Sequence, residues 1–293
     1  KPAPAVELAR RLGGEIVSVD SMQVYRGLDV GTAKPTAEER AATPHHLLDV
    51  CDLTQPFDAA QFARLARQAG EDVLRRGRTP IFCGGAGLSS RALREGFDPL
   101  PPADPALRAA LEAVPLATLV AELRARDPAR AGQTDLRNPR RVIRAVEILR
   151  QGGRRPADHA ATGESTAVPP PLWVLRRTPE DLRARIGRRV DAMFAARLVE
   201  ETRRLRAAGL DRAPTARQAL GYRQVLEHLD GVRDLPATVE LVKRRTWQYA
   251  RRQMTWFRGQ RDARWLDVPP AEAPDVTAGH LLQAWASPVT QWN

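Results

Sequence analysis

Five segments of the sequence contain residue types that could bind or react with a ligand. The first is residues 20–26 (DSMQVYR), which bring a carboxylate, an amide and a phenol together directly after a short apolar run. In a parallel sheet, ligands bind beyond the carboxyl ends of the strands, so these groups could hydrogen-bond to a polar planar group there. Asp-Ser pairs are also common in turns and caps, and for this segment alone the turn is the favoured explanation.

Two further segments suggest an anion site and a metal site. Lys34 follows Gly31 and Thr32, and a lysine beside small residues could hold an anion. His45 and His46 are adjacent, but the side chains of neighbouring residues usually point in different directions, and no third ligand is obvious. We therefore expect the histidines to be positioning or solvent-exposed residues, and we predict no metal ligand among the side chains.

The last two segments are rich in glycine and in arginine. Residues 84–88 (GGAGL) follow a second apolar run, where glycines allow either a tight turn or the close approach of a ligand, and the turn is favoured without further context. Residues 238–258 carry six basic side chains interleaved with tryptophan, tyrosine and phenylalanine. A solvated basic face is the ordinary interpretation of such a run, but this density of arginines and aromatic rings favours phosphate binding.

The elements expected around these segments alternate between helix and strand. We expect helices over residues 5–12 and 59–76 and strands over residues 15–19 and 79–83, because of the spacing of apolar residues and the flanking glycines. This order is typical of a parallel sheet covered by helices, so an α/β fold is predicted. Further along the chain we expect a strand over 172–175, one long helix from 179 that includes Leu205, helices near 215–229 and 237–257, and a strand over 265–268.

The domain organisation follows from a change in composition at the proline-rich segment 99–105. Three helices are expected after it, near residues 105–113, 116–126 and 139–151, and then a connector rich in Gly, Pro, Ser and Thr. We therefore predict that residues 1–100 and 171–293 form one α/β core domain and that residues 101–170 form a helical insertion.

The overall composition indicates the class of partner. The formal net charge of +11 favours a polyanionic partner such as nucleic acid. No apolar run approaches the length of about 18 residues that a membrane-spanning helix needs, and the N-terminus lacks the pattern of a signal peptide. Two cysteines without paired spacing argue against a zinc site or a disulfide framework. We expect a cytoplasmic monomer with no membrane contact.

Taken together and in this order, the segments resemble the tRNA dimethylallyltransferase family. The match extends from Lys1 to about Trp265, and DSMQVYRGLDVGTAKP alone is highly specific. The matching segments are GGEIVSVDSMQVYRGLDVGTAKPTAEE, PHHLLDV, GRTPIFCGGAGL, LPPADP, RRVIRAVEI, GYRQ and RRQMTWFR. The resemblance implies a P-loop NTPase-like α/β core with a helical insertion. It also implies transfer of a dimethylallyl group from dimethylallyl diphosphate to N6 of adenosine 37 in the tRNA anticodon loop, with Mg²⁺ as the cofactor.

The resemblance also implies roles for individual residues. Asp20 corresponds to the general base or orienting group for N6 of the adenosine. Lys1 and Arg252 correspond to the groups that bind the diphosphate. The implied tRNA-binding residues are Ser21, Gln23, Arg141, Arg144 and Arg251, and those of the substrate channel are Gly85, Ala86 and Gly87.

The chain departs from the family pattern at several motif positions. Pro2 replaces the hydroxyl residue that follows the P-loop lysine, Ala86 replaces a threonine, Ser89 a tyrosine and Trp247 an arginine. Because the sequence begins with Lys1 rather than Met, we expect residues upstream of it, including the start of the P-loop. Three alternatives therefore stay open: impaired transfer, a catalytically silent tRNA-binding homologue, and a P-loop kinase for nucleotides or small molecules.

Overall fold

The computed structural model describes residues 3–95, 101, 104–152 and 171–286. Lys1, Pro2 and most of the connector expected between the insertion and the core lie outside these residues. The chain divides into two compact units, Lys1–Glu95 with Pro169–Asn293, and Gly96–Val168. We call the first the core unit and the second the helical unit, and describe each by itself.

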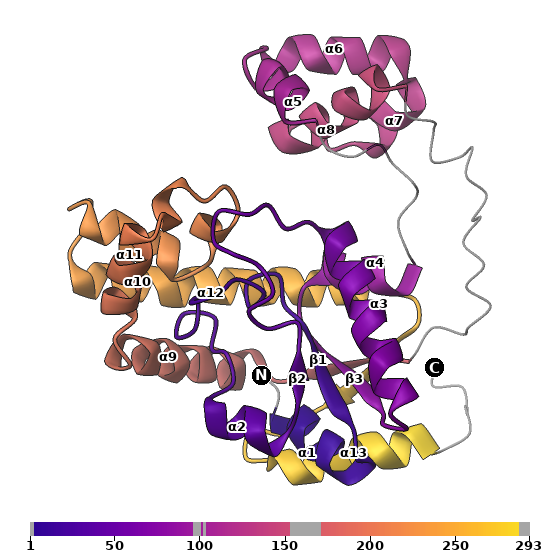
Figure 1. The fold of residues 1–293 in the computed structure, drawn as a ribbon, viewed down its shortest axis with the longest axis vertical. Helices are drawn as coiled ribbons and strands as arrows, with labels where there is room; N and C mark the ends of the chain where they lie inside the picture. The colour runs from indigo at the N-terminus through magenta and orange to yellow at the C-terminus, as the bar shows by residue number, and fades with distance from the viewer. Residues whose placement is uncertain (1–2, 96–100, 102–103, 153–170, 287–293) are drawn as a thin grey trace. The chain divides into compact units, whose positions relative to one another are not determined.

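Parallel strands form two sheets in the described part of the core unit (Figure 1). Their bounds are β1 (Glu15–Val19), β2 (His45–His46), β3 (Pro80–Gly84), β4 (Leu172–Arg176) and β5 (Ala263–Asp267). The first sheet has the order β2-β1-β3, and β4 pairs with β5 in the second. All five residues of β1 are buried, as expected of a central strand. The prediction of an α/β fold with parallel strands is confirmed.

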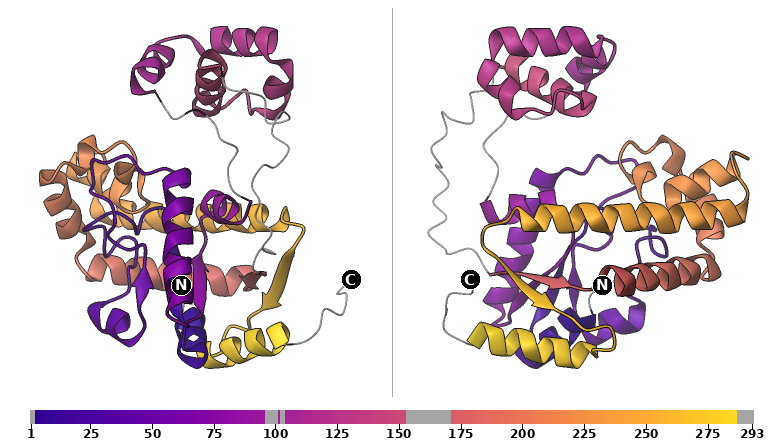
Figure 2. Two further views of the ribbon diagram at one scale, coloured as in Figure 1. Left: turned by 45° about the vertical axis from the view of Figure 1, so that its right-hand side comes forward. Right: turned by 180° about the vertical axis from the view of Figure 1, so that it is seen from behind.

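Helices surround these sheets (Figure 2). Their bounds are α1 (Ala3–Leu12), α2 (Ala37–Ala42), α3 (Ala59–Arg75), α4 (Gly87–Glu95), α9 (Pro179–Ala195), α10 (Leu198–Ala207), α11 (Tyr222–Leu229), α12 (Leu235–Arg258) and α13 (Pro274–Ala286). The side chain of Asp58 accepts hydrogen bonds from the backbone of Ala60 and Gln61, and the Gln61 side chain returns to Asp58, so α3 begins with a capping box.

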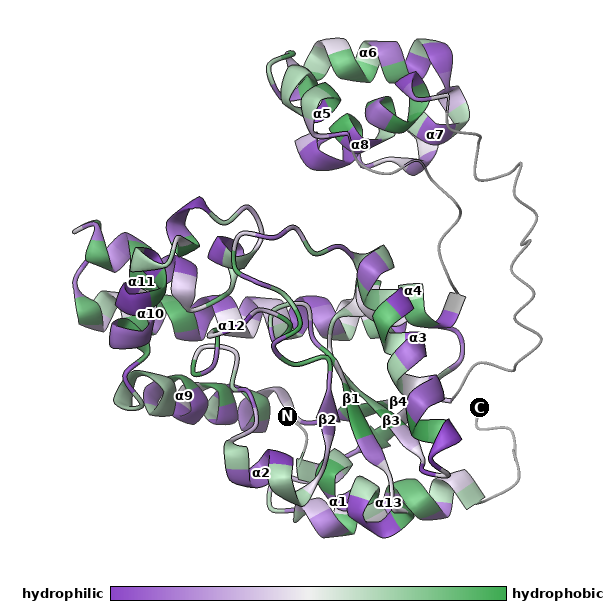
Figure 3. Ribbon diagram, in the orientation of Figure 1, coloured by the Kyte–Doolittle hydropathy of each residue, from purple (hydrophilic) through white to green (hydrophobic). Residues whose placement is uncertain are grey.

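Three apolar clusters lie in the core unit, and two of them involve β1 or the segment that follows it. The first packs Val17 and Val19 of β1 against Phe62 and Ala66 of α3. Hydrophobic residues accordingly predominate in β1 and β3, whereas the helices carry hydrophobic and hydrophilic residues (Figure 3). The second cluster joins α9, α10 and α11 to the segment after β1 through fully buried side chains such as Tyr222. The segment after β1 is therefore fixed by helices that come much later in the chain.

The prediction of one long helix that starts at residue 179 and includes Leu205 is wrong, because the structure divides this segment into α9 and α10. Arg197 lies between the two helices with a φ of 68° and a ψ of 40°, in the left-handed region that ends a right-handed helix. Met193 and Leu205, one from each helix, pack into the same apolar cluster. Apolar spacing continues across the break, so periodicity alone does not reveal it.

The helical unit is a small bundle with its own core. Its helices are α5 (Pro105–Glu112), α6 (Leu116–Arg126), α7 (Pro128–Gln133) and α8 (Pro139–Arg150). The core consists of the buried side chains of Leu111, Leu119, Leu123, Ala131, Val142, Ala145 and Val146. The three expected helices are present, and α7 is an additional short helix. Its start is marked by the side chain of Asp127, which accepts a hydrogen bond from the Arg130 amide at 3.0 Å.

Glu147 of α8 is the polar centre of this bundle. Its carboxylate is fully buried and accepts hydrogen bonds from the Asp104 amide at 2.8 Å, from Arg108 at 2.6 Å and from Arg144 at 2.8 Å. Burial by itself would raise the pKa of Glu147, but the two guanidinium groups and the Asp104 amide outweigh burial and lower this pKa. The carboxylate therefore joins the start of α5 to α8 as an ion.

Candidate active site

The turn after β1 holds Asp20. Its Oδ1 accepts hydrogen bonds from the Met22 amide at 2.9 Å and the Gln23 amide at 3.3 Å. This is the turn geometry that the Asp-Ser pair predicts. Ser21 is exposed, whereas Asp20 is half-buried at the carboxyl end of the central strand, which is where ligands of parallel sheets bind. The turn explanation and a site role for Asp20 are therefore compatible.

Gln23, expected to contact tRNA, is buried in the core unit. Its Nε2 donates to the carbonyl oxygens of Thr32 at 3.1 Å and Ala33 at 3.2 Å, and its Oε1 accepts from the Ser18 hydroxyl at 2.8 Å. Both amide hydrogens are thus engaged, and the side chain is only 4% exposed. In this arrangement Gln23 holds the neighbouring loop in place rather than offering its amide to a ligand.

The anion-binding interpretation of Lys34 is wrong. Its ammonium group is 1% exposed and donates to Asp29 Oδ1 at 2.9 Å, Asp49 Oδ1 at 2.5 Å and the Tyr25 carbonyl oxygen at 2.6 Å. These three acceptors use the three donors of an ammonium group. Asp49 lies fifteen positions away in the sequence, so local composition could not identify it as the partner.

The two histidines make bonds within the protein. His45 Nδ1 lies 2.6 Å from the Thr43 carbonyl oxygen, and His46 Nε2 lies 2.6 Å from the buried Glu15 carboxylate. Desolvation lowers the pKa of His45, which favours its neutral form. No group of three His, Cys, Asp or Glu residues that could hold a metal ion occurs among the described residues. The positioning role expected for the histidines agrees with these contacts.

The glycines that follow β3 allow α12 to approach closely. The side-chain Nε2 of Gln253 donates to the Gly85 carbonyl oxygen at 2.8 Å. A Cβ atom at Gly85 would lie 2.2 Å from that nitrogen, and a Cβ atom at Gly87 would lie 2.5 Å from the Trp256 ring. Glycine at position 87 is therefore favoured by its contact with a ring far along the chain, whereas a Cβ atom at position 85 would displace the end of the flexible Gln253 side chain.

A cavity of about 150 Å³ lies at this contact. The residues that line it are Gly85, Gly87, Leu88, Tyr249, Arg252, Gln253 and Trp256. Two expected channel glycines and the expected diphosphate anchor thus share one cavity. Ala86, the third expected channel residue, is absent from this lining, and its amide bonds to the Val19 carbonyl oxygen at 3.4 Å.

Electrostatic effects connect Asp20 to the same region. Desolvation raises the pKa of the Tyr249 phenol, and the Asp20 charge raises it further, whereas Gln253 and Arg252 oppose the change. The Cζ atom of Arg252 lies 5.9 Å from the centre of the Tyr249 ring. Desolvation also lowers the pKa of Arg189 on α9, and the Asp20 charge opposes this change. The Asp20 charge therefore acts on Tyr249, which lines the cavity, and on Arg189 of α9.

Several residues of this region were missed by sequence reasoning. Arg189 lies in a helix with three other arginines, so composition does not distinguish it. Gln253 lies between Arg252 and Trp256 in the segment RRQMTWFR, which resembles the family. Its position in that segment is a signal that could have identified it. Trp247, which departs from the family pattern, packs into the apolar cluster of α9 and α12, with Arg183 Cζ 5.5 Å from its ring centre.

The other expected site residues are dispersed. Arg251 is exposed on α12, and Arg141 is exposed on α8 of the helical unit. Arg144 bonds to Glu147 and, at 2.6 Å, to the Pro101 carbonyl oxygen, so it stabilises the bundle. Lys1 lies outside the described residues. No helix in the described part of the chain is long and apolar enough to cross a bilayer.

Comparisons with known proteins find similarity to one family of transferases along nearly the whole chain. The sequence model of the IPP transferase family matches residues 23–260. A tRNA dimethylallyltransferase of Anaeromyxobacter dehalogenans (strain 2CP-C) is 48% identical over 275 residues, which cover 92% of this chain and 91% of the relative. A tRNA dimethylallyltransferase of Xanthomonas axonopodis pv. citri (strain 306) is 45% identical over 282 residues, with 91% and 86% of the two chains covered.

Solved structures show the same similarity. The full-length tRNA isopentenylpyrophosphate transferase of Bacillus halodurans matches with a TM-score of 0.70 and 36% identity, over 97% of this chain and 91% of that one. A eukaryotic dimethylallyltransferase acting on tRNA matches with a TM-score of 0.81 and 26% identity, over 98% and 77% of the two chains. The P-loop NTPase-like α/β fold class expected from the sequence is confirmed by these matches.

Proposed function

The chain belongs to the IPP transferase family, and from that premise we propose that it transfers a dimethylallyl group from dimethylallyl diphosphate to N6 of adenosine 37 in tRNA. The observation that carries the proposal is the cavity in which Gly85, Gly87 and Arg252 meet, together with the effect of the Asp20 charge on Tyr249, which lines the same cavity. The relatives that cover nine-tenths of the chain are transferases of this kind, so the kinase and the silent homologue are not favoured.

The acceptor side of the reaction centres on Asp20. An exocyclic amine is a poor nucleophile, and a carboxylate that accepts its proton as the new bond forms lowers the barrier. The N6–C1 bond forms, the C1–O bond to the diphosphate breaks, the leaving diphosphate takes the electron pair, and the N6 proton passes to Asp20. Because Met22 and Gln23 amides hold Oδ1, the carboxylate is fixed in one orientation before the adenine arrives.

The donor side centres on Arg252, with Arg189 as a second cation. Negative charge develops on the diphosphate as the C1–O bond breaks, and fixed guanidinium groups stabilise it. Leu88 and Trp256 are proposed to offer apolar walls to the allyl group, and Gly87 lets α4 pack directly against the Trp256 ring. Lys1 is proposed to contribute a further positive charge on the phosphate side.

Magnesium is proposed to arrive with the donor. The described residues contain no group of three metal-ligating side chains. Mg²⁺ in proteins is commonly bound by substrate phosphates with one or two carboxylates and several waters. When bound with the diphosphate, Mg²⁺ would neutralise part of the negative charge that the phosphates carry.

The tRNA is proposed to contact both units. Arg251 on α12 and Arg141 on α8 are exposed, and the chain carries a net charge of +11. We propose residues 101–170 as the insertion that grips tRNA phosphates, with Ser21 beside the extruded adenine. Arg144 contributes through the stability of the bundle rather than by direct contact, because its guanidinium is engaged by Glu147. We infer a cytoplasmic monomer.

The experiment that tests this proposal is transfer from isotopically labelled dimethylallyl diphosphate to unmodified tRNA. Nucleoside mass spectrometry should detect N6-dimethylallyladenosine, and digestion should locate the label at position 37. Consumption of ATP without tRNA, and no labelled nucleoside, would instead support the kinase. Turnover at the ordinary enzyme rate of about 1 per second or faster would refute impairment by Pro2, Ala86 and Trp247.

A further inference from the structure

A buried carboxylate on α10 lies far along the chain from the turn that carries Asp20. The Glu201 side chain is 9% exposed, and no ion pair to it occurs among the described residues. A buried carboxylate is costly unless hydrogen bonds replace its water shell. Glu201 receives these bonds from the Val30 amide, 3.1 Å from both carboxylate oxygens, and from the Tyr222 hydroxyl.

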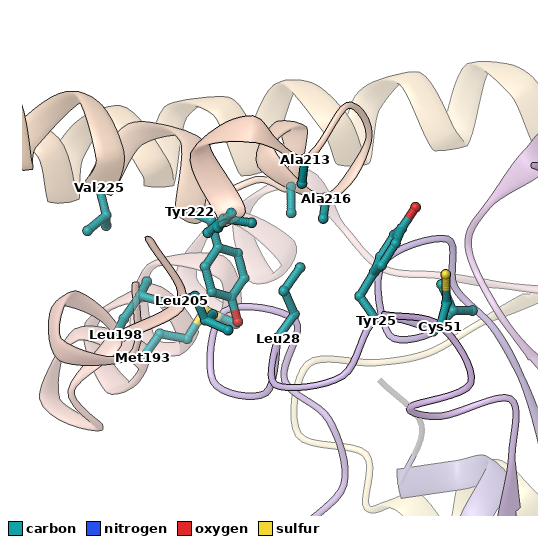
Figure 4. Packing of buried hydrophobic residues seen from close by; sticks show 13 residues of the cluster. Tyr25, Leu28, Cys51, Met193, Leu198, Leu205, Ala213, Ala216, Tyr222 and Val225 are labelled. Atoms are coloured by element: carbon teal, nitrogen blue, oxygen red, sulfur yellow. The ribbon is translucent and has the colours of Figure 1, made fainter. Parts of the chain in front are cut away.

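Tyr222 extends the same network to Gly31, the next residue of the loop that Asp29 and Lys34 close at its base. Its hydroxyl oxygen lies 2.5 Å from Glu201 Oε1 and accepts a hydrogen bond from the Gly31 amide at 3.0 Å. A Cβ atom at Gly31 would lie 2.4 Å from the Tyr222 ring, so the loop backbone packs directly against the ring. Figure 4 shows the Tyr222 hydroxyl pointing from α11 towards the loop that carries Leu28. Desolvation and the Glu201 carboxylate raise the pKa of Tyr222, which keeps the phenol protonated.

The part of the loop that Tyr222 and Glu201 hold is bonded in turn to Gln23. The residues that follow Gly31 are Thr32 and Ala33, whose carbonyl oxygens accept the two bonds from the Gln23 amide. The backbone amide of Gln23 in turn donates to Asp20 Oδ1. A continuous series of hydrogen bonds therefore runs from Glu201 and Tyr222, through the loop, to the carboxylate.

The base of the loop is held independently. Lys34 joins Asp29 to Asp49, and the Lys34 amide donates to the Asp29 carbonyl oxygen at 3.0 Å. Removing one hydroxyl at Tyr222 therefore leaves the two ends of the loop in place. We expect the loop tip to move while the fold persists.

We propose that Glu201 and Tyr222 are positioning residues that orient Asp20 through the loop and Gln23. The inference rests on the proposed function, in which Asp20 contacts the adenine. Neither residue contacts the substrate in this account, and both act by fixing the backbone carbonyls that bind Gln23. A hydrogen bond to a buried charged group typically changes an equilibrium by about tenfold or more.

The test compares Tyr222→Phe, which removes only the hydroxyl, with Val225→Ala as the matched control. Val225 is fully buried in the same apolar cluster but makes no side-chain hydrogen bond to the loop. Tyr222→Phe should lower kcat about tenfold while KM for dimethylallyl diphosphate stays within about twofold, because Asp20 acts on the acceptor. Val225→Ala should lower the melting temperature and leave kcat unchanged.

A second readout does not depend on activity. Asp20 Oδ1 protects the Met22 and Gln23 amides, so hydrogen exchange at these two amides reports the turn directly. Their exchange should accelerate about tenfold in Tyr222→Phe and stay unchanged in Val225→Ala. Glu201→Gln, which keeps one carbonyl acceptor, should give an intermediate rate.

The two readouts separate the proposals. If the wild-type protein shows no transfer, the proposed function fails, and exchange alone still decides the positioning role. Unchanged exchange at Met22 and Gln23 in Tyr222→Phe would overturn the inference. An equal loss of kcat in Val225→Ala would overturn it as well, since that result would reveal a purely structural role for the cluster.

Discussion

Replacing Gly87 by alanine tests the close contact that forms the cavity. The new Cβ atom would lie 2.5 Å from the Trp256 ring, closer than real Cβ atoms approach any neighbour. Either α4 or the ring must shift, and overpacking of this kind costs about 1–3 kcal/mol. At about 2–4 °C per kcal/mol for a chain of this size, the melting temperature should fall by roughly 2–12 °C.

The matched control is Gly187→Ala in α9 of the same unit. Gly187 lies in the interior of a helix, and an added Cβ atom there meets nothing within 4 Å. Alanine is better than glycine in a helix interior by about 1 kcal/mol, so this variant should melt about 2–4 °C higher. The same substitution should therefore change stability in opposite directions at the two positions.

Two assays check this prediction. Thermal unfolding followed by circular dichroism gives the melting temperatures, and steady-state kinetics give kcat/KM for dimethylallyl diphosphate. A shift of the Trp256 ring should lower kcat/KM of Gly87→Ala about tenfold or more, because small displacements of positioning groups are costly. If Gly87→Ala were as stable and as active as Gly187→Ala, the packing argument for the cavity would be refuted.

Three further predictions concern charged groups. Arg252→Lys should lower kcat/KM for the donor about 100-fold, because an ammonium group does not reproduce guanidinium geometry on a diphosphate. The control Arg251→Lys should change kcat/KM less than about threefold. Steady-state kinetics with varied dimethylallyl diphosphate distinguish the two variants. Lys34→Met removes the buried ammonium group between Asp29 and Asp49, although Asp49 keeps its ion pair with Arg40, and should destabilise the fold by about 1.5–3 kcal/mol in urea unfolding, with KM for the donor unchanged in the folded protein. Glu147 has a lowered pKa in the folded state, so its contribution to stability is present above the unfolded value of about 4.3 and is lost as the pH falls through the lower folded value. Glu147→Gln should therefore flatten the acid limb of a stability–pH profile, and an unchanged acid limb would contradict this assignment.

Local patterns predicted the first half of the core well. The strands around Val17 and Phe82 are short apolar runs next to glycines, and apolar spacing with a glycine after it indicated the helix over residues 59–76, which the structure has as α3. Each of these signals lies within a few residues, where propensity and hydrogen bonding act directly. The order of strands and helices followed, and with it the parallel α/β class.

Long-range contacts were not predictable in the same way. Lys34 could be assigned to an anion only while its partner Asp49 was unknown, and Gln23 could be assigned to tRNA only while its acceptors were unknown. The break at Arg197 depends on packing in three dimensions, because the apolar spacing continues through it. Arg189 is one of many arginines, and only its proximity to Asp20 distinguishes it.

The candidate site was partly predictable because motif residues keep their order along the chain. The sequence indicated Asp20, the glycines after β3 and Arg252 separately. The cavity shared by these glycines and Arg252 depends on α12 lying against the backbone at Gly85, a contact between positions 168 residues apart. Spacing along the chain does not encode such a contact, and only the folded structure reveals it.

The most direct measurement is the single-turnover rate of transfer to tRNA by Asp20→Asn, with Asp52→Asn as the control. Asp52 is an exposed partner of Arg26 outside the cavity. With both substrates saturating, the account predicts a loss of about 100-fold or more in Asp20→Asn and a wild-type rate in Asp52→Asn. Equal rates in wild type and Asp20→Asn would contradict the claim that this carboxylate accepts the proton of the adenine amine.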